Sequence, residues 1–219
     1  MWQTVCENQV WVMDNFLSQE ELDHVLKEWE SFTSFRVVEQ RQEEYLLAPI
    51  YYHSKQPQRP PRTRKQIQKF VIKKLNTLYL NVFGKAAETD NLTHAQFYFK
   101  ESEPNVSRFD LHVEPGPQDK NSFGDCVFML YLSDEEDSPL VCPSEEDARE
   151  FITDTYNKCI AEMDIKYVTE TQSILPKQNR CVVVRNGTPH YVPTGKGIRK
   201  CITGWSFIPR KLKNSTDAL

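Results

Sequence analysis

Hydrophobic positions in the first part of the chain recur at the three- and four-residue spacing of amphipathic helices. One such segment spans residues 19–31, and Ser18 with Glu21 forms the residue pair of a capping box at its start. A second segment spans residues 63–83 and ends before Gly84, a residue type common just after helices. The apolar sides of the two helices consist of Leu22, Val25, Leu26 and Trp29, and of Ile67, Phe70, Val71, Leu75, Leu78 and Val82.

From about residue 92 the pattern changes, and apolar positions alternate with polar ones as in half-buried β-strands. One helical interruption is predicted at residues 144–163, with Ser144 as its N-cap. The proline-rich segment 54–65 predicts an irregular loop. Strands are predicted at residues 10–13, 44–52, 93–100, 108–114, 125–133, 139–143, 165–171 and 199–207, and in the β-rich run before His190. Alternation implies sheets with one buried face, which is typical of a β-sandwich or an open barrel.

The composition is that of a globular protein, and we predict one domain at residues 1–210 followed by a tail at residues 211–219. Of its 219 residues, 39% are hydrophobic and 26% are charged, which is ordinary for a soluble domain. The net charge of −4 gives no reason to expect nucleic acid or an anionic membrane as a partner. No apolar run approaches the roughly 20 residues of a membrane span, and residues 1–14 lack the features of a secretory leader. A cytoplasmic location is therefore predicted.

The six cysteines are widely scattered and form no C-x-x-C pair. Three of them, Cys126, Cys181 and Cys201, lie within predicted strands, where a reduced cysteine behaves as a small core residue. This distribution favours free thiols in a reducing compartment over a disulfide framework.

A strongly basic segment links the predicted loop to the second helix. Between His53 and Lys74 there are eight lysines or arginines and no acidic residue. Such a segment can form a basic rim that faces an anionic or acidic substrate. The alternative, a charged loop and a solvated helix face, is the favoured interpretation.

Two predicted strands and one turn carry the residues with metal-binding chemistry. His112 and Glu114 are two positions apart in a strand, so their side chains share one face. With His190 they complete two imidazoles and one carboxylate, the ligand set of non-haem Fe(II) oxygenases. Nine residues beyond His190, Arg199 heads an inward-facing row and needs an anion as partner. A ligand carboxylate is one candidate for that anion, and an internal carboxylate is the other.

Seven short segments in order resemble one known family. They are Q-F-Y-F, His112-V-Glu114, M-L-Tyr131-L-S, P-L-V-C-P, L-P-K-Q-N-R-C-V-V-V, His190-Y-V and Arg199-K-C-I-T-G-W. Together they resemble the 2-oxoglutarate- and Fe(II)-dependent oxygenases of the prolyl-4-hydroxylase-like group, which includes the hypoxia-factor prolyl hydroxylases. The sequence departs from that group in having Glu114 where aspartate is commoner, and Ser138-Pro139 where a glycine pair is usual.

The resemblance implies a double-stranded β-helix core over about residues 92–208, with helical support over about 15–85. It implies Fe(II) held by His112, Glu114 and His190, with 2-oxoglutarate and O₂ as cosubstrates and ascorbate as a stimulant of turnover. The residues that it assigns to 2-oxoglutarate are Arg199, Tyr131, Tyr98 and Thr203, with Leu140 lining the same slot and Met129 and Trp205 shaping the pocket. The activity implied is oxidative decarboxylation of 2-oxoglutarate to succinate and CO₂, coupled to hydroxylation of a C–H bond.

The substrate is a separate question, and several answers stay open. Hydroxylation of a protein residue, above all proline, is the leading hypothesis, with the basic segment 55–74 and the loop 115–124 flanking the pocket. Hydroxylation of a free amino acid or another small metabolite is the second. A non-catalytic interaction module that keeps the oxygenase fold is the third, and Glu114 is the residue that motivates it. Repair of alkylated nucleic acid is disfavoured by the acidic net charge.

Overall fold

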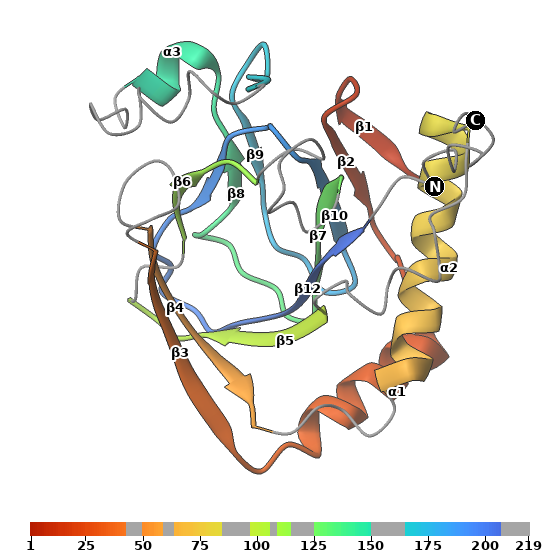
Figure 1. Ribbon diagram of the computed structural model, residues 1–219. Helices are drawn as coiled ribbons and strands as arrows, with labels where there is room; N and C mark the ends of the chain where they lie inside the picture. Colours follow the sequence, from red (N-terminus) through yellow and green to blue (C-terminus); the bar gives the residue numbers. More distant parts are fainter. Residues whose placement is uncertain are drawn as a thin grey trace, which may run out of the picture.

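The computed structural model describes residues 1–42, 50–58, 64–84, 97–105, 109–114, 125–149 and 165–206. Two long helices and two β-sheets form its framework, and Figure 1 shows both helices on the same side of the strands. The helices are α1 (Gln19–Glu30), α2 (Arg64–Phe83) and the short α3 (Glu145–Ala148). Both predicted N-terminal helices are therefore confirmed, while residues 150–164 of the predicted helix 144–163 lie outside the described part of the chain.

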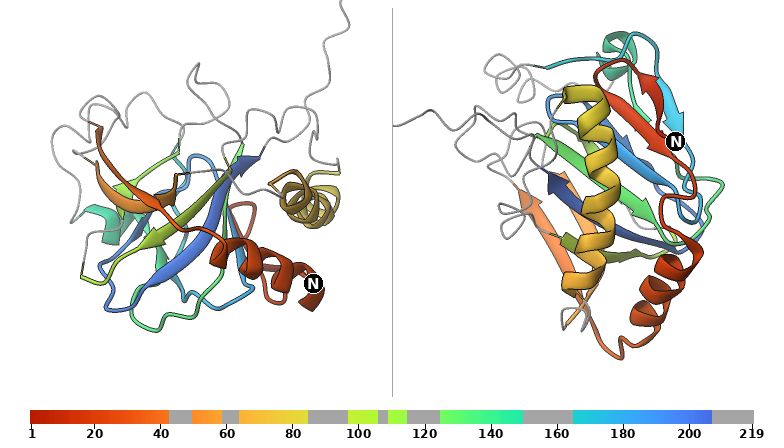
Figure 2. Two further views of the ribbon diagram at one scale, coloured as in Figure 1. Left: turned by 90° about the horizontal axis from the view of Figure 1, so that it is seen from below. Right: turned by 90° about the vertical axis from the view of Figure 1, so that its right-hand side faces the viewer.

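The larger sheet has the strand order β1-β2-β10-β7-β12-β5-β4-β3, and every described pairing within it is antiparallel. Its strands are β1 (Gln3–Cys6), β2 (Val10–Met13), β3 (Phe35–Gln42), β4 (Ile50–Pro57), β5 (Phe97–Ser102), β7 (Cys126–Tyr131), β10 (Cys181–Arg185) and β12 (Arg199–Ser206). The helix α2 lies across one face of this sheet (Figure 2, right).

The smaller sheet has the order β6-β11-β8-β9. Its strands are β6 (Phe109–His112), β8 (Leu140–Cys142), β9 (Gln172–Ile174) and β11 (His190–Val192). From β5 onward the chain passes repeatedly from one sheet to the other, so that the two sheets enclose an interior. The fold is a double-stranded β-helix supported by helices, as predicted.

The central strands separate two cores because alternate side chains point to opposite faces of the larger sheet. Towards α1 and α2 point Trp11, Cys126, Phe128, Leu130, Cys181, Val183 and Ile202. Towards the smaller sheet point Val10, Val12, Val127, Tyr131, Val182, Val184 and Cys201. The prediction that each sheet has one buried face is therefore wrong for these strands. The helices cover the second face, which the alternation alone could not reveal.

The start of α1 shows how the local sequence sets the position of a helix. Ser18 accepts a hydrogen bond from the backbone N–H of Glu21, and the Glu21 carboxylate accepts one from the Ser18 backbone, which completes the predicted capping box. Phe16 and Leu17, immediately before the cap, are buried in the helix-side core. At the other long helix, Gly84 follows the last helical residue with φ of 67°, a conformation that suits glycine.

Two predictions about strands need correction, and two strands were missed. Residues 165–171 form no strand, and β9 begins only at Gln172. Val168 is buried in the core between the two sheets, which we call the inner core, and makes an isolated bridge to Ser144. The hydrophobic signal there came from packing of one side chain, not from a sheet. Residues 54–57 belong to β4 instead of an irregular loop, because β4 pairs with β3 along its whole length. The edge strands β1 and β3 of the larger sheet were not predicted.

The described cysteines bear out the expectation of free thiols. Cys6, Cys126, Cys142, Cys181 and Cys201 form no disulfide, and all except Cys6 are buried. None of the helices described is both long enough and apolar enough to cross a membrane.

Asn179 links the segment before α1 to the end of β7 through hydrogen bonds of its side chain and backbone. Its side chain accepts a hydrogen bond from the Leu17 backbone N–H at 2.8 Å and donates one to the Leu17 carbonyl oxygen at 2.9 Å. Its backbone accepts from Phe16 and donates to the carbonyl oxygen of Tyr131, the last residue of β7. Asn179 is 7% exposed and adopts a positive φ of 62°. The start of α1 and the end of β7 are therefore both positioned by one residue.

Replacing Asn179 with alanine is expected to lower the free energy of unfolding by about 3 kcal/mol, measured by urea denaturation. The variant leaves two buried backbone groups of Leu17 without the side chain that they bond. It also replaces asparagine, which tolerates the left-handed region, with alanine, which disfavours it. Asn8→Ala is the matched control, since Asn8 has φ of 59° but is exposed. A loss of about 1 kcal/mol is expected there. Equal losses in the two variants would mean that the Leu17 hydrogen bonds add no stability.

Candidate metal and carboxylate site

Two histidines and one glutamate converge where the smaller sheet borders the interior. His112 is the last residue of β6 and pairs in register with His190, the first residue of β11. Their ring centroids are 4.3 Å apart, and the Nε2 atom of His112 lies 3.7 Å from the carboxylate of Glu114. One potential ligand atom from each of the three residues lies within 4.8 Å of the others. The structure thus brings together the three residues that the sequence predicted as metal ligands.

The turn before β11 determines which nitrogen of His190 is available. The Nδ1 atom of His190 lies 2.9 Å from the carbonyl oxygen of Thr188, which can only accept a hydrogen bond. The proton therefore resides on Nδ1, and the lone pair of Nε2 is left for a metal. In the same turn Gly187, with φ of 92°, donates its backbone N–H to the carbonyl oxygen of Glu114 at 3.0 Å. This bond links the backbones that carry Glu114 and His190.

The electrostatics of the cluster favour a neutral histidine beside an ionised carboxylate. Burial, reinforced by the neighbouring His112, lowers the pKa of His190 to about 4 despite the opposing effects of Glu114 and Thr188. Burial by itself raises the pKa of Glu114. The attraction of both histidines and a hydrogen bond from Trp205 outweigh it, so the pKa of this carboxyl lies below its ordinary value. Both states are the ones that bind a divalent cation.

Trp205 of β12 orients the carboxylate of Glu114. Its indole Nε1–H donates to Oε2 of Glu114 at 3.0 Å, while Oε1 is the oxygen near His112. Carboxylate ligands of metals are commonly held by such outer hydrogen bonds. Sequence analysis gave Trp205 a pocket-shaping role, and this direct contact with the candidate ligand was not foreseen.

A second buried polar group is formed by Tyr131 and Arg199. Arg199 is 4% exposed, and its Cζ atom lies 5.5 Å from the centroid of the Tyr131 ring. Tyr131 is fully buried, and its hydroxyl has no hydrogen-bond partner among the described residues. Burial raises the pKa of Tyr131 to about 12, so the hydroxyl keeps its proton at neutral pH. An unsatisfied buried donor beside a guanidinium fits the carboxylate of a ligand.

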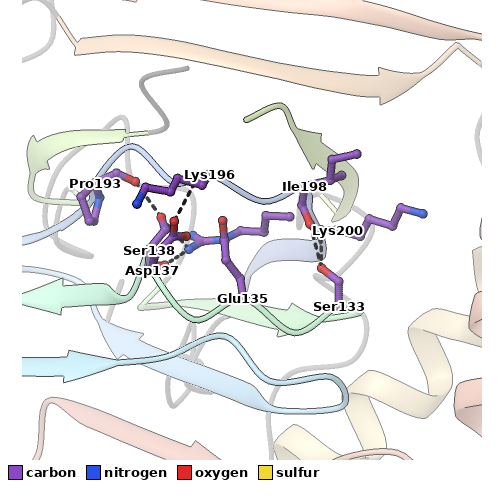
Figure 3. A network of polar contacts seen from close by, with 9 residues as sticks. Ser133, Glu135, Asp137, Ser138, Pro193, Lys196, Ile198 and Lys200 are labelled. Atoms are coloured by element: carbon purple, nitrogen blue, oxygen red, sulfur yellow. Dashed lines mark hydrogen bonds and ion pairs between the residues drawn. The ribbon is translucent and has the colours of Figure 1, made fainter. Parts of the chain in front are cut away.

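The guanidinium of Arg199 already has partners within the chain. Its Nε donates to Oε2 of Glu135 at 3.0 Å, and Nη2 donates to the carbonyl oxygen of Ser138 and, at 3.0 Å, to its hydroxyl oxygen. The Ser138 hydroxyl in turn donates to the carbonyl oxygen of Pro193 at 2.7 Å (Figure 3). Of the two anions considered for Arg199, the internal carboxylate is therefore present.

Glu135 and Ser138 were both missed from the sequence. Glu135 is one of four acidic residues in the turn S-D-E-E-D-S, where Asp134, Glu136 and Asp137 are exposed and Glu135 is buried. Composition marks such a run as solvated, and only the path of the turn decides which member points inward. Ser138 stands where the group that the sequence motifs resemble usually has a glycine, and its contact with Arg199 was not predicted.

The other predicted pocket residues lie on neighbouring strands. Tyr98 of β5 pairs in register with Thr203 of β12, which in turn pairs with Met129 of β7. Tyr98 also meets Trp205 edge to face, with ring centroids 6.4 Å apart. Leu140 of β8 is fully buried in the inner core. The structure therefore groups these residues near the candidate site without assigning any of them a ligand.

The basic segment does not flank the site over its described helical part. The helix α2, which carries Lys65, Lys69, Lys73 and Lys74, packs on the outer face of the larger sheet (Figures 1 and 2). The strands β6 and β11, which carry His112 and His190, belong to the smaller sheet on the other side. The strand β4, by contrast, lies beside β6. The favoured interpretation, a solvated helix face, thus agrees with the structure for α2. The loop 115–124 lies outside the described residues.

Comparison with known proteins adds evidence on the fold. The sequence matches no protein-family model, and it matches no curated protein. A prolyl-4-hydroxylase from Pseudomonas putida has a similar structure, with 14% identity and a TM-score of 0.53 over 90% of this chain and 91% of that one. A prolyl hydroxylase from Trichoplax adhaerens, in complex with a hypoxia-inducible factor peptide fragment, is 12% identical with a TM-score of 0.58, over 91% and 84%. The α-ketoglutarate-dependent carbocyclase SnoK from nogalamycin biosynthesis is 13% identical with a TM-score of 0.55, over 90% and 79%.

The fold of this chain is accordingly that of the 2-oxoglutarate-Fe(II) oxygenases. Prolyl hydroxylases are among the structures that share it, so the resemblance predicted from the sequence motifs is confirmed at the level of the fold.

Proposed function

We propose that the protein is a dioxygenase dependent on Fe(II) and 2-oxoglutarate, with His112, Glu114 and His190 as the metal ligands. The observation that carries this proposal is the convergence of these three side chains, with ligand atoms within 4.8 Å, inside a fold shared with such oxygenases. Two neutral imidazoles and one carboxylate form the facial ligand set that suits Fe(II) and leaves coordination positions open for small ligands. The lowered pKa values of Glu114 and His190 are consistent with that donor set.

The proposed cosubstrate pocket is formed by the second polar group. Tyr131 offers a protonated hydroxyl without a partner among the described residues, and the guanidinium of Arg199 lies beside it. These donors would bind one carboxylate of 2-oxoglutarate, and the apolar residues around them would keep water from the site. When bound, Fe(II) and 2-oxoglutarate supply, with O₂, oxidative decarboxylation to succinate and CO₂ and hydroxylation of a substrate C–H bond.

For the substrate we propose a residue in a protein, above all proline. Two of the solved structures with this fold are prolyl hydroxylases, and one of them was determined with a peptide bound. A small molecule is the second candidate, because the carbocyclase from nogalamycin biosynthesis shares the fold to a similar degree. Turnover of free amino acids or metabolites without turnover of proline-containing peptides would decide for the second candidate.

The primary test is succinate release from 2-oxoglutarate by the full chain supplied with Fe(II), with and without ascorbate. Release that depends on Fe(II) and rises with a proline-containing peptide library is expected. If no succinate forms and Mn(II), used as a stand-in for Fe(II), does not bind, the alternative of a non-catalytic module is favoured instead.

If Trp205 orients the carboxylate of Glu114, its loss should weaken metal binding without abolishing it. Trp205→Phe keeps an aromatic ring but removes the hydrogen bond to Glu114, so the affinity for Mn(II) is expected to fall about tenfold. Electron paramagnetic resonance of free Mn(II) measures it. Trp2→Phe is the matched control, because it also removes an indole hydrogen bond, to Thr77 at 3.0 Å, outside the site. Equal Mn(II) affinities of wild type and Trp205→Phe would exclude an orienting role for the indole.

A further inference from the structure

Glu135 is a buried acid that contacts Arg199, the residue proposed to bind a carboxylate of 2-oxoglutarate. A negative charge is unexpected at that position. We propose that Glu135 determines cosubstrate specificity: it is a built-in counter-ion of Arg199 that weakens binding of a 2-oxo acid carrying a second carboxylate. This inference rests on the proposed function, since it concerns the pocket assigned there to 2-oxoglutarate.

The contact between Glu135 and Arg199 is an ion pair shielded from water. The Nε and Oε2 atoms are 3.0 Å apart, and the two side chains are 5% and 2% exposed. Charges at this depth are only weakly screened, so each dominates the electrostatics of the other. The positive charge that would attract a ligand carboxylate is therefore already matched within the protein.

Hydrogen bonds to two neighbouring segments hold the turn that carries Glu135. On one side the backbone N–H of Glu135 donates to the carbonyl oxygen of Pro176 at 3.3 Å, and the carboxylate of Asp134 accepts from the backbone of Gln178 at 2.8 Å. On the other side the backbone N–H of Lys196 donates to Asp137 at 3.0 Å (Figure 3).

These contacts hold the turn against both neighbouring segments. Because the turn is held on either side of Glu135, the carboxylate can move away from Arg199 without breaking these hydrogen bonds only by rotation of its own side chain.

Donors for a ligand nevertheless remain next to the pair. Glu135 and Ser138 use Nε and Nη2 of Arg199, and among the described residues Nη1 makes no hydrogen bond. The hydroxyl of Tyr131 is likewise unpartnered in the described part of the chain. The pocket thus keeps the hydrogen-bonding groups for an oxygen-bearing ligand end but lacks net positive charge. A neutral polar end satisfies such a pocket as well as a carboxylate does, whereas a carboxylate adds an unmatched buried charge.

Glu135→Gln is the sharpest probe of this inference. Glutamine has the same shape, and its side-chain oxygen can still accept from Nε of Arg199, so the variant removes the negative charge and little else. Isothermal titration of the Mn(II)-loaded full chain is expected to show 2-oxoglutarate binding about tenfold more tightly to the variant than to the wild type. Binding of pyruvate, which has no second carboxylate, is expected to be unchanged. Glu136→Gln, an exposed change in the same turn, is expected to leave both affinities as they are.

A second measurement needs no variant and covers the case in which Glu135→Gln does not fold. The wild type is expected to bind 2-oxoglutaramate, whose distal group is an amide, at least as tightly as 2-oxoglutarate. A wild type that prefers the dicarboxylate tenfold, or a Glu135→Gln variant with unchanged or weaker 2-oxoglutarate binding, overturns the inference. Failure of the proposed function is distinguishable from this, because it is seen beforehand as absence of Mn(II) binding by the wild type.

Discussion

Replacement of His190 by alanine is expected to weaken Mn(II) binding by more than about 100-fold and to abolish succinate release. The loss should exceed the 10- to 100-fold typical of outer-shell changes, because His190 supplies one of the three proposed ligand atoms directly. Mn(II) titration by electron paramagnetic resonance measures affinity without relying on turnover. The result would distinguish a metal ligand from a histidine that only packs against His112.

His24→Ala is the control for that experiment. His24 lies on α1, half-buried, with its ring against Phe70 on the helix-covered side of the larger sheet. Its loss is expected to leave Mn(II) affinity unchanged. Retained Mn(II) affinity in His190→Ala, with the fold intact by circular dichroism, would refute ligation by this residue.

Replacement of Arg199 by methionine is expected to lower the free energy of unfolding by about 3–5 kcal/mol, which is the usual effect of leaving one member of a buried ion pair without its partner. Methionine retains most of the apolar stem of arginine, so the effect of charge dominates that of a cavity. Glu135, whose side chain is 2% exposed, would lose the guanidinium that its carboxylate faces while staying buried. Urea denaturation gives the change.

The double variant Arg199→Met/Glu135→Gln separates the ion pair from other contributions. Removing the charge of Glu135 as well is expected to restore about half or more of the lost stability, because no buried charge is then left. If the double variant is as unstable as the sum of the two single variants, the two residues are not coupled and the ion pair is not the source of the loss. The same pair of variants must still bind Mn(II), since neither residue belongs to the proposed ligand set.

The sequence was sufficient to predict those elements whose structure depends on residues close together in the chain. The capping box at Ser18 and the spacing of apolar residues located α1 and α2, and the H-x-E spacing placed His112 and Glu114 together. His190 was added to them from ligand chemistry and from the resemblance, and no local pattern indicated it, because β6 and β11 are far apart in the chain and meet only by strand pairing.

What the sequence could not supply depends on contacts between distant segments. The burial of Glu135 follows from how its turn is fastened to the segments around Pro176 and Lys196, and no property of the acidic run itself indicates it. The strand at residues 54–57 exists because β3 pairs with it, although its own residues are polar or proline. In both cases the determining partner is a remote piece of backbone.

Because alternate residues of the central strands face two different cores, the residues that support the helices are not the residues that face the candidate site. Along β7, Phe128 and Leu130 hold the helices in place, whereas Met129 and Tyr131 belong to the side of the candidate site. On β12, Ile202 packs in the core beneath the helices, and Thr203 lies on the opposite face of the strand. Every second position can therefore vary with the chemistry of the pocket while its neighbours preserve the helical support.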